Sequence, residues 1–177
     1  GENPQKGRYR EFLQCDIDTV GSSSPLADGE IIACTIKSLE NLGFKNFKVL
    51  INDRNNFAEI DPLAILTIDK LKKIGKEAVL EELKRKGLPT SSLTDVLNKK
   101  LTNRLKDIIE IVNDSRIVFD QTLARGLDYY TGMIFEVEIE GYKGGSVAGG
   151  GRFDKLIGLF SGKDIPAVGV AFGFDRI

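Results

Sequence analysis

The chain has 177 residues, 41% of them apolar, which is enough for one domain with a sizeable core and argues against disorder. Its 25 basic and 26 acidic side chains nearly cancel, so net charge gives no general argument for nucleic-acid binding. These residues include no histidine, which excludes any Ser-His-Asp triad, Cys-His pair or histidine metal site built from them. Arginines suit phosphate chemistry instead, because a guanidinium donates paired hydrogen bonds to phosphate or carboxylate.

Cellular location and redox state follow from what the sequence lacks. It shows no recognisable signal peptide and no apolar run long enough to span a membrane, so we expect a cytoplasmic protein. Cys15 and Cys34 fit no disulfide or metal pattern and are expected to be reduced thiols in the core.

Residues 1–54 are predicted to form a basic loop, a strand, a helix and a second strand. In EFLQCDIDTVG, residues 11–21, apolar and polar side chains alternate with the period of a half-buried strand, so Gln14 and Asp18 point the same way. Ser24 and Pro25 suit the start of a helix, and Gly43 suits its end. FKVLINDR, residues 47–54, is typical of a buried strand.

Residues 55–113 are predicted to be a helical insertion. Lysines, leucines and glutamates recur with helical spacing in 68–86 and 93–112, separated by Gly87, Pro89 and a Thr-Ser-Ser run. The basic residues here are compatible with solvated helix faces, or as a group with an RNA backbone. They are Lys70, Lys72, Lys73, Lys76, Lys84, Arg85, Lys86, Lys99, Lys100, Arg104 and Lys106.

Residues 114–177 return to strand character. The runs 116–125, 132–141, 144–154 and 165–177 are short, apolar and separated by glycines. Consecutive strands of this kind, with helices set apart, favour an α+β fold with an antiparallel sheet. Glu136, Glu138 and Glu140 share one strand face, which we interpret as solvated, since metal sites with oxygen ligands usually draw on several segments.

Arginines recur beside glycine-rich or loop-like backbone in three distant segments, 7–18, 122–132 and 148–176. Gly149, Gly150 and Gly151 would let a ligand lie against the sheet, although the run lacks the ending of a phosphate loop. Asp18 and Gln14 could bind a ligand ammonium group, and Arg125 a carboxylate or phosphate. Tyr129 and Tyr130 could form the wall of a pocket for a polar ring. Together these residues suit a site in which an amino acid meets a nucleotide. The alternative interpretation, drawn without reference to any protein family, is a plain α+β domain that binds phosphate.

The same segments carry a family resemblance that covers essentially the whole chain. GRYREFLQCDID, residues 7–18, resembles the second half of motif 2 of class II aminoacyl-tRNA synthetases, as found in histidyl-tRNA synthetases. ARGLDYYTG, residues 124–132, is similar to the signature peptide of the histidine enzymes. AGGGRFD and PAVGVAFGFDRI, residues 148–154 and 166–177, resemble the glycine run and motif 3. The resemblance implies a class II synthetase fold: an antiparallel sheet flanked by helices, here with a helical insertion.

The resemblance also implies residue roles. Gln14 and Asp18 would hold the α-amino group of histidine, and the catalytic Arg125 would contact both its carboxylate and the α-phosphate of ATP. Tyr129 and Tyr130 would line the imidazole pocket, with Gly149, Gly150 and Gly151 as its floor. The remaining ATP contacts would come from Glu2, Arg8, Arg10 and Arg176, the last gripping the γ-phosphate.

The implied activity is that of a histidine–tRNA ligase, which joins L-histidine to tRNA(His) through histidyl-adenylate. Magnesium would arrive with ATP, held mainly by its phosphates and without a protein metal site, and the full-length parent would be a homodimer without membrane attachment. Compared with the family pattern, motif 1, the principal motif 2 arginine, upstream pocket residues and the anticodon-binding domain are missing, and Asp175 replaces the usual glutamate. We therefore expect a fragment that is inactive alone.

Two relatives of these enzymes offer alternative interpretations. One is a histidine-sensing regulatory subunit of ATP phosphoribosyltransferase, and the other is a tRNA-binding pseudoenzyme domain of a stress-sensing kinase. Such paralogues tend to lose the signature peptide and the ATP-gripping arginines. Arg125, the two tyrosines and Arg176 are all present here, which favours the enzyme.

Overall fold

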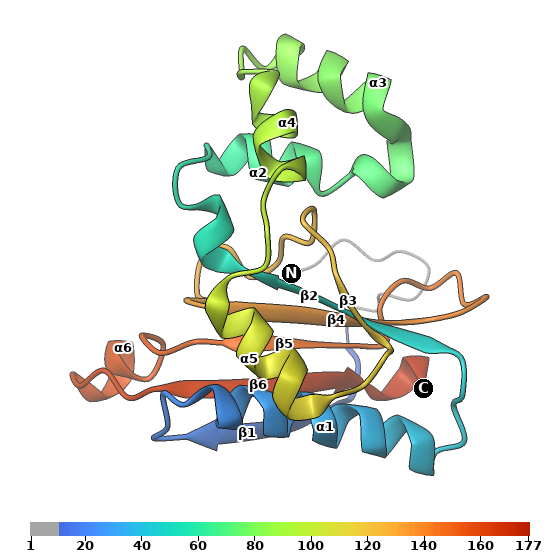
Figure 1. The fold of residues 1–177 in the computed structure, drawn as a ribbon, viewed down its shortest axis with the longest axis vertical. Helices are drawn as coiled ribbons and strands as arrows, with labels where there is room; N and C mark the ends of the chain where they lie inside the picture. The colour runs from blue at the N-terminus through green and yellow to red at the C-terminus, as the bar shows by residue number, and fades with distance from the viewer. Residues whose placement is uncertain (1–10) are drawn as a thin grey trace.

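A six-stranded sheet forms the centre of the computed structural model, which describes residues 11–177 (Figure 1). The strands run in the order β1-β6-β5-β4-β2-β3, and every neighbouring pair is antiparallel except β2 and β3. This arrangement confirms the predicted α+β fold with an antiparallel sheet. The strands are β1 (Gln14–Val20), β2 (Phe47–Asp53), β3 (Ile117–Phe119), β4 (Met133–Ile139), β5 (Ala148–Arg152) and β6 (Ala167–Gly173).

The first strand and helix follow the predicted pattern. Gln14 and Asp18 lie on the same side of β1, opposite Gly173 and Gly169 of β6. Because β1 is an edge strand with one neighbour, it is more exposed than predicted. Cys15 is therefore exposed, and Cys34 is half-buried, so neither lies in the core as predicted, although both are free thiols.

Helix α1 (Pro25–Asn41) begins and ends where the sequence indicates. The Ser24 hydroxyl caps it by accepting a hydrogen bond from the Leu26 amide at 3.2 Å. Gly43, with φ of +92°, turns the chain after it. Together with α5 (Asn103–Val112), α1 covers one face of the sheet and buries Ile31, Ile32 and Leu39.

Three further helices form a separate group beyond the β2 side of the sheet (Figure 1). They pack on the face of β2 and β4 that is opposite α1 and α5. They are α2 (Pro62–Ile68), α3 (Leu71–Arg85) and α4 (Ser91–Leu97). Their apolar side chains pack on Leu50 and Ile134 of the sheet and on Leu123 and Ala124. The short elements are η1 (Arg54–Phe57), α6 (Gly158–Ser161) and η2 (Phe174–Arg176).

The structure of the insertion differs from the sequence prediction in two respects. The single helix predicted over 93–112 is two helices, because α4 ends at Leu97 and the Thr102 hydroxyl caps a new helix by accepting from Leu105 at 3.3 Å. Helix α2 was not predicted, although Asp61 caps it and Pro62 begins it.

The division into 1–54, 55–113 and 114–177 stays a prediction. By packing, α2–α4 share one apolar cluster, whereas α5 belongs to the cluster of α1 and the sheet. The chain leaves β2 at Asp53 and enters α5 after Thr102, whose hydroxyl donates to the Asp53 carboxylate at 2.9 Å. The two ends of the α2–α4 segment are therefore joined side by side.

A buried ion cluster ties α1, α5 and β5 together. Asp28 of α1 is fully buried and accepts hydrogen bonds from Arg152 at 2.8 Å and from Arg104 at 2.7 Å. Arg152, whose side chain is 3% exposed, also donates to Asp154 at 2.9 Å. Burial raises the pKa of Asp28, and the two guanidinium groups oppose that rise.

Within residues 11–177 there is no helix that combines the length and hydrophobicity needed to cross a membrane.

Candidate functional site

The sheet face opposite α1 and α5 is lined by small residues along β5 and β6. Gly149 pairs with Ala171, and Gly151 pairs with Gly169, which in turn pairs with Asp18. Because side chains alternate along a strand, all of these positions share one face. Without bulky side chains there, other groups can lie directly against the backbone of the sheet.

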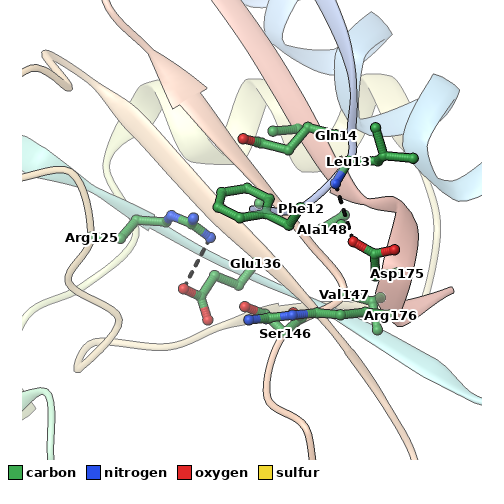
Figure 2. Close-up of a pocket in the computed structure, with 13 residues that line it drawn as sticks. Phe12, Leu13, Gln14, Arg125, Glu136, Ser146, Val147, Ala148, Asp175 and Arg176 are labelled. Carbon is green, nitrogen blue, oxygen red and sulfur yellow. Dashed lines mark hydrogen bonds and ion pairs between the residues drawn. The ribbon is translucent and has the colours of Figure 1, made fainter. Parts of the chain in front are cut away.

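A pocket opens on this face where β1, β5 and β6 meet the Arg125 segment (Figure 2). Arg125 and Arg176 approach it from different sides, and Gln14 lies at its rim. The lining consists of Phe12, Leu13, Gln14, Arg125, Glu136, Ser146, Val147, Ala148, Gly149, Ala171, Gly173, Asp175 and Arg176. The structure therefore brings together Gln14, Arg125, Gly149 and Arg176, which the sequence placed in one site.

Arg125 lies flat over Gly149. Its Nη1 donates to the Glu136 carboxylate at 3.0 Å and approaches the Phe135 carbonyl at 3.5 Å. Its Nε is buried and has no hydrogen-bond partner among the described residues. An unpaired buried donor is costly, so this nitrogen is suited to an acceptor supplied by a ligand.

Glu136 is a site residue that sequence reasoning missed. Burial raises the pKa of its carboxyl group, and the positive charge of Arg125 opposes that rise. The interpretation of Glu136, Glu138 and Glu140 as a solvated face is thus wrong for Glu136, although Glu138 and Glu140 are exposed. The period-two pattern gave the correct face of β4, but it could not show that Arg125 covers Glu136.

Asp18 and Tyr130 lie one step further along the same face. A Cβ atom on Gly169 would overlap the Asp18 carboxylate, and one on Gly151 would lie 2.9 Å from the Tyr130 ring. The Tyr129 and Tyr130 rings are in contact, with centroids 4.3 Å apart, and Tyr129 is exposed. Burial raises the pKa of Tyr130, which keeps its phenol protonated as a hydrogen-bond donor.

The remaining predicted residues are placed differently. Gly150 faces the opposite side of the sheet, against Phe135 and the Gly169 carbonyl, so its Cα hydrogens do not face the pocket. Arg176 follows β6 and donates from Nη1 to the Ser146 carbonyl at 2.6 Å. Glu2, Arg8 and Arg10 lie outside the described residues. Over residues 11–177, no three His, Cys, Asp or Glu side chains converge as metal ligands.

The Gly149→Ala substitution is expected to displace Arg125, because the added Cβ would overlap its guanidinium group. Overpacking of this kind typically costs about 1–3 kcal/mol of stability. Gly132→Ala is a matched control, since its Cβ would meet Arg152 at an ordinary 3.4 Å. Crystal structures of both variants test the prediction. An Arg125–Glu136 distance that stays at 3.0 Å in Gly149→Ala would contradict it.

Comparisons with known proteins agree with this geometry. A family model described as histidyl-tRNA synthetase matches residues 56–177. Histidine–tRNA ligase of Aeropyrum pernix is 43% identical over 210 residues, and that of Korarchaeum cryptofilum is 44% identical over 208. Each alignment covers 99% of this chain but 48% and 49% of the relative, so the chain spans about half the length of these relatives.

The fold comparison gives the same result. The crystal structure of histidyl-tRNA synthetase from a Nostoc species superposes with a TM-score of 0.80 at 28% identity, covering 94% of this chain and 49% of that one. A family model that matches well over half of the chain, relatives above 40% identity and this superposition lead to one conclusion. The chain belongs to the histidyl-tRNA synthetase family.

Proposed function

We propose that the protein is a histidine–tRNA ligase, which activates L-histidine with ATP and transfers the histidyl group to the 3′ end of tRNA(His). The observation that carries the proposal is the convergence of Arg125, Arg176 and Gln14 on one pocket over a glycine floor. Two guanidinium groups and an amide in such a pocket suit a carboxylate and a polyphosphate.

Histidine would bind along the open face of the sheet. Gln14 and Asp18, on the same side of β1, can accept hydrogen bonds from its α-ammonium group. Tyr130, over Gly151, and the adjacent Tyr129 offer a hydrogen-bonding wall for the imidazole ring. Arg125, over Gly149, would then meet the carboxylate where it faces the nucleotide.

The reaction would proceed by attack of the histidine carboxylate on the α-phosphorus of ATP, with pyrophosphate as the leaving group. Negative charge grows on the phosphate oxygens in the transition state, and fixed cations stabilise it there. Arg125 suits this role because its buried Nε has no partner among residues 11–177. Arg176 would grip the γ-phosphate, and alignment of the two reactants would supply much of the remaining acceleration.

Magnesium would bring added charge neutralisation, bound mainly to the ATP phosphates, because Glu136 is already paired with Arg125. We also propose a cytoplasmic location and a homodimeric complete protein. Since the chain spans about half the length of its relatives, we propose that residues 1–177 do not form the adenylate alone.

Histidine-dependent ATP–pyrophosphate exchange by the complete protein tests this function. Exchange with histidine, and not with other amino acids, is the expected result. Histidine binding without exchange would instead favour a histidine-sensing regulatory subunit. Adenylate formation by residues 1–177 alone would contradict the proposal that the rest of the protein is needed.

A further inference from the structure

The segment that carries Arg125 has little regular structure of its own. Strand β3 ends at Phe119, and residues 120–125 continue as a loop rather than as the predicted strand. Leu123 and Ala124 are nevertheless buried, because they pack against the apolar cluster of α2–α4. Something other than a strand ladder must therefore fix the path of this loop.

The Asp120 amide donates to the Ile51 carbonyl at 3.0 Å, and the residues after it are held by the fully buried side chain of Asn52 in β2. Its Nδ2 donates to the carbonyls of Gln121 and Leu123, both at 3.1 Å. Leu123 is two residues before Arg125, so the amide holds the loop at the point where it turns into the pocket. One primary amide has two donors, and both are used on this loop.

The acceptor side of Asn52 is also satisfied. Its Oδ1 accepts from the Asp53 amide at 2.8 Å and from the Asn56 side chain at 2.9 Å. Since the side-chain oxygen is held by two donors, the amide cannot flip without breaking all four bonds. This rigidity is what a residue needs if it is to position another group.

We propose that Asn52 is a positioning residue for Arg125, and that it supports adenylate formation by fixing residues 121–123 without touching either substrate. The proposal rests on the proposed function for its kinetic consequence. Displacing a reacting group by about 1 Å can cost roughly 10²-fold in rate. We therefore expect Asn52→Ala to lower kcat for exchange roughly 10²-fold, with a much smaller change in the KM for ATP.

A double-mutant comparison separates positioning from general destabilisation. If Asn52 acts through Arg125, Asn52→Ala should cause no further loss of rate in an Arg125→Ala background. A merely structural role predicts the same fold-reduction in both backgrounds, and that result would overturn the proposal. Thr35→Ala is the control, because Thr35 is a fully buried polar side chain whose hydroxyl donates within α1, to the Ile31 carbonyl at 2.7 Å.

Amide hydrogen exchange of residues 120–130 in the complete protein provides a readout independent of activity. We expect faster exchange there in Asn52→Ala and little change in Thr35→Ala; equal protection in both variants would reject the proposal. If Asn52→Ala does not fold, Asn52→Ser leaves a smaller cavity and one donor, and the same comparisons apply. If the wild type shows no histidine-dependent exchange, the proposed function fails, and hydrogen exchange still tests the positioning role.

Discussion

Arg125→Ala is expected to lower the rate of histidine-dependent pyrophosphate exchange roughly 10²–10³-fold, the range for removing one fixed donor to a developing oxyanion. The guanidinium group lies over Gly149 inside the pocket, where its Nε, unpaired among the described residues, can meet an acceptor of a ligand. The substitution eliminates that unpaired buried Nε but leaves the partly buried Glu136 carboxylate without its cation, so stability has to be measured beside the rate. The measurement is kcat for exchange, with thermal unfolding to confirm that the variant is folded.

Arg116→Ala is the control for loss of an arginine elsewhere. Arg116 binds Asp114 and Glu40 and stacks on the Phe47 ring, with its guanidinium carbon 4.6 Å from the ring centre. It does not line the pocket. If both variants lost the same fraction of activity, the assignment of Arg125 to the chemistry would be wrong.

Asp28→Ala is expected to destabilise the fold by about 3–5 kcal/mol, the cost of removing one partner from a buried ion pair. The reason is that Arg152 and Arg104 would remain close together without the carboxylate that lies between them. Arg152 ends β5, so the loss would loosen the strand that provides the glycine floor. Urea unfolding of the complete protein, followed by circular dichroism, measures the change in free energy.

Glu40→Ala serves as the comparison for an exposed pair. Glu40 binds Arg116 at 2.8 Å, but its side chain is 37% exposed and solvent screens the pair, so we expect a far smaller loss than for Asp28→Ala. Equal losses in the free energy of unfolding for Asp28→Ala and Glu40→Ala would show that the buried cluster stabilises the fold no more than the exposed pair.

The sequence predicted those features that depend on local pattern. Alternation placed Gln14 and Asp18 on one side of β1, and the Ser24-Pro25 pair placed the start of α1, because both signals arise from neighbouring residues. The family resemblance put Gly149 and Arg125 in one site, but that Arg125 itself lies over Gly149 became visible only in the structure.

Features that depend on distant partners were not predicted. Glu136 looks like any exposed glutamate in an alternating strand until Arg125, eleven residues earlier, covers it. Gly150 lies in the same run as Gly149, yet the pleat turns it to the other face. The residues around Asn52 give no indication of its role, since that role depends on carbonyl groups about 70 residues away in sequence.

The Asp53–Thr102 hydrogen bond has a consequence for how this fold tolerates change in length. Asp53 and Thr102, which flank the α2–α4 segment, are hydrogen-bonded to each other. The number of residues between them therefore does not affect the spacing of the strands. The segment can be lengthened, shortened or exchanged as a module while the strand register is preserved. A replacement must supply an apolar surface that covers Leu50 and Ile134 of the sheet and also Leu123 and Ala124 of the loop that carries Arg125.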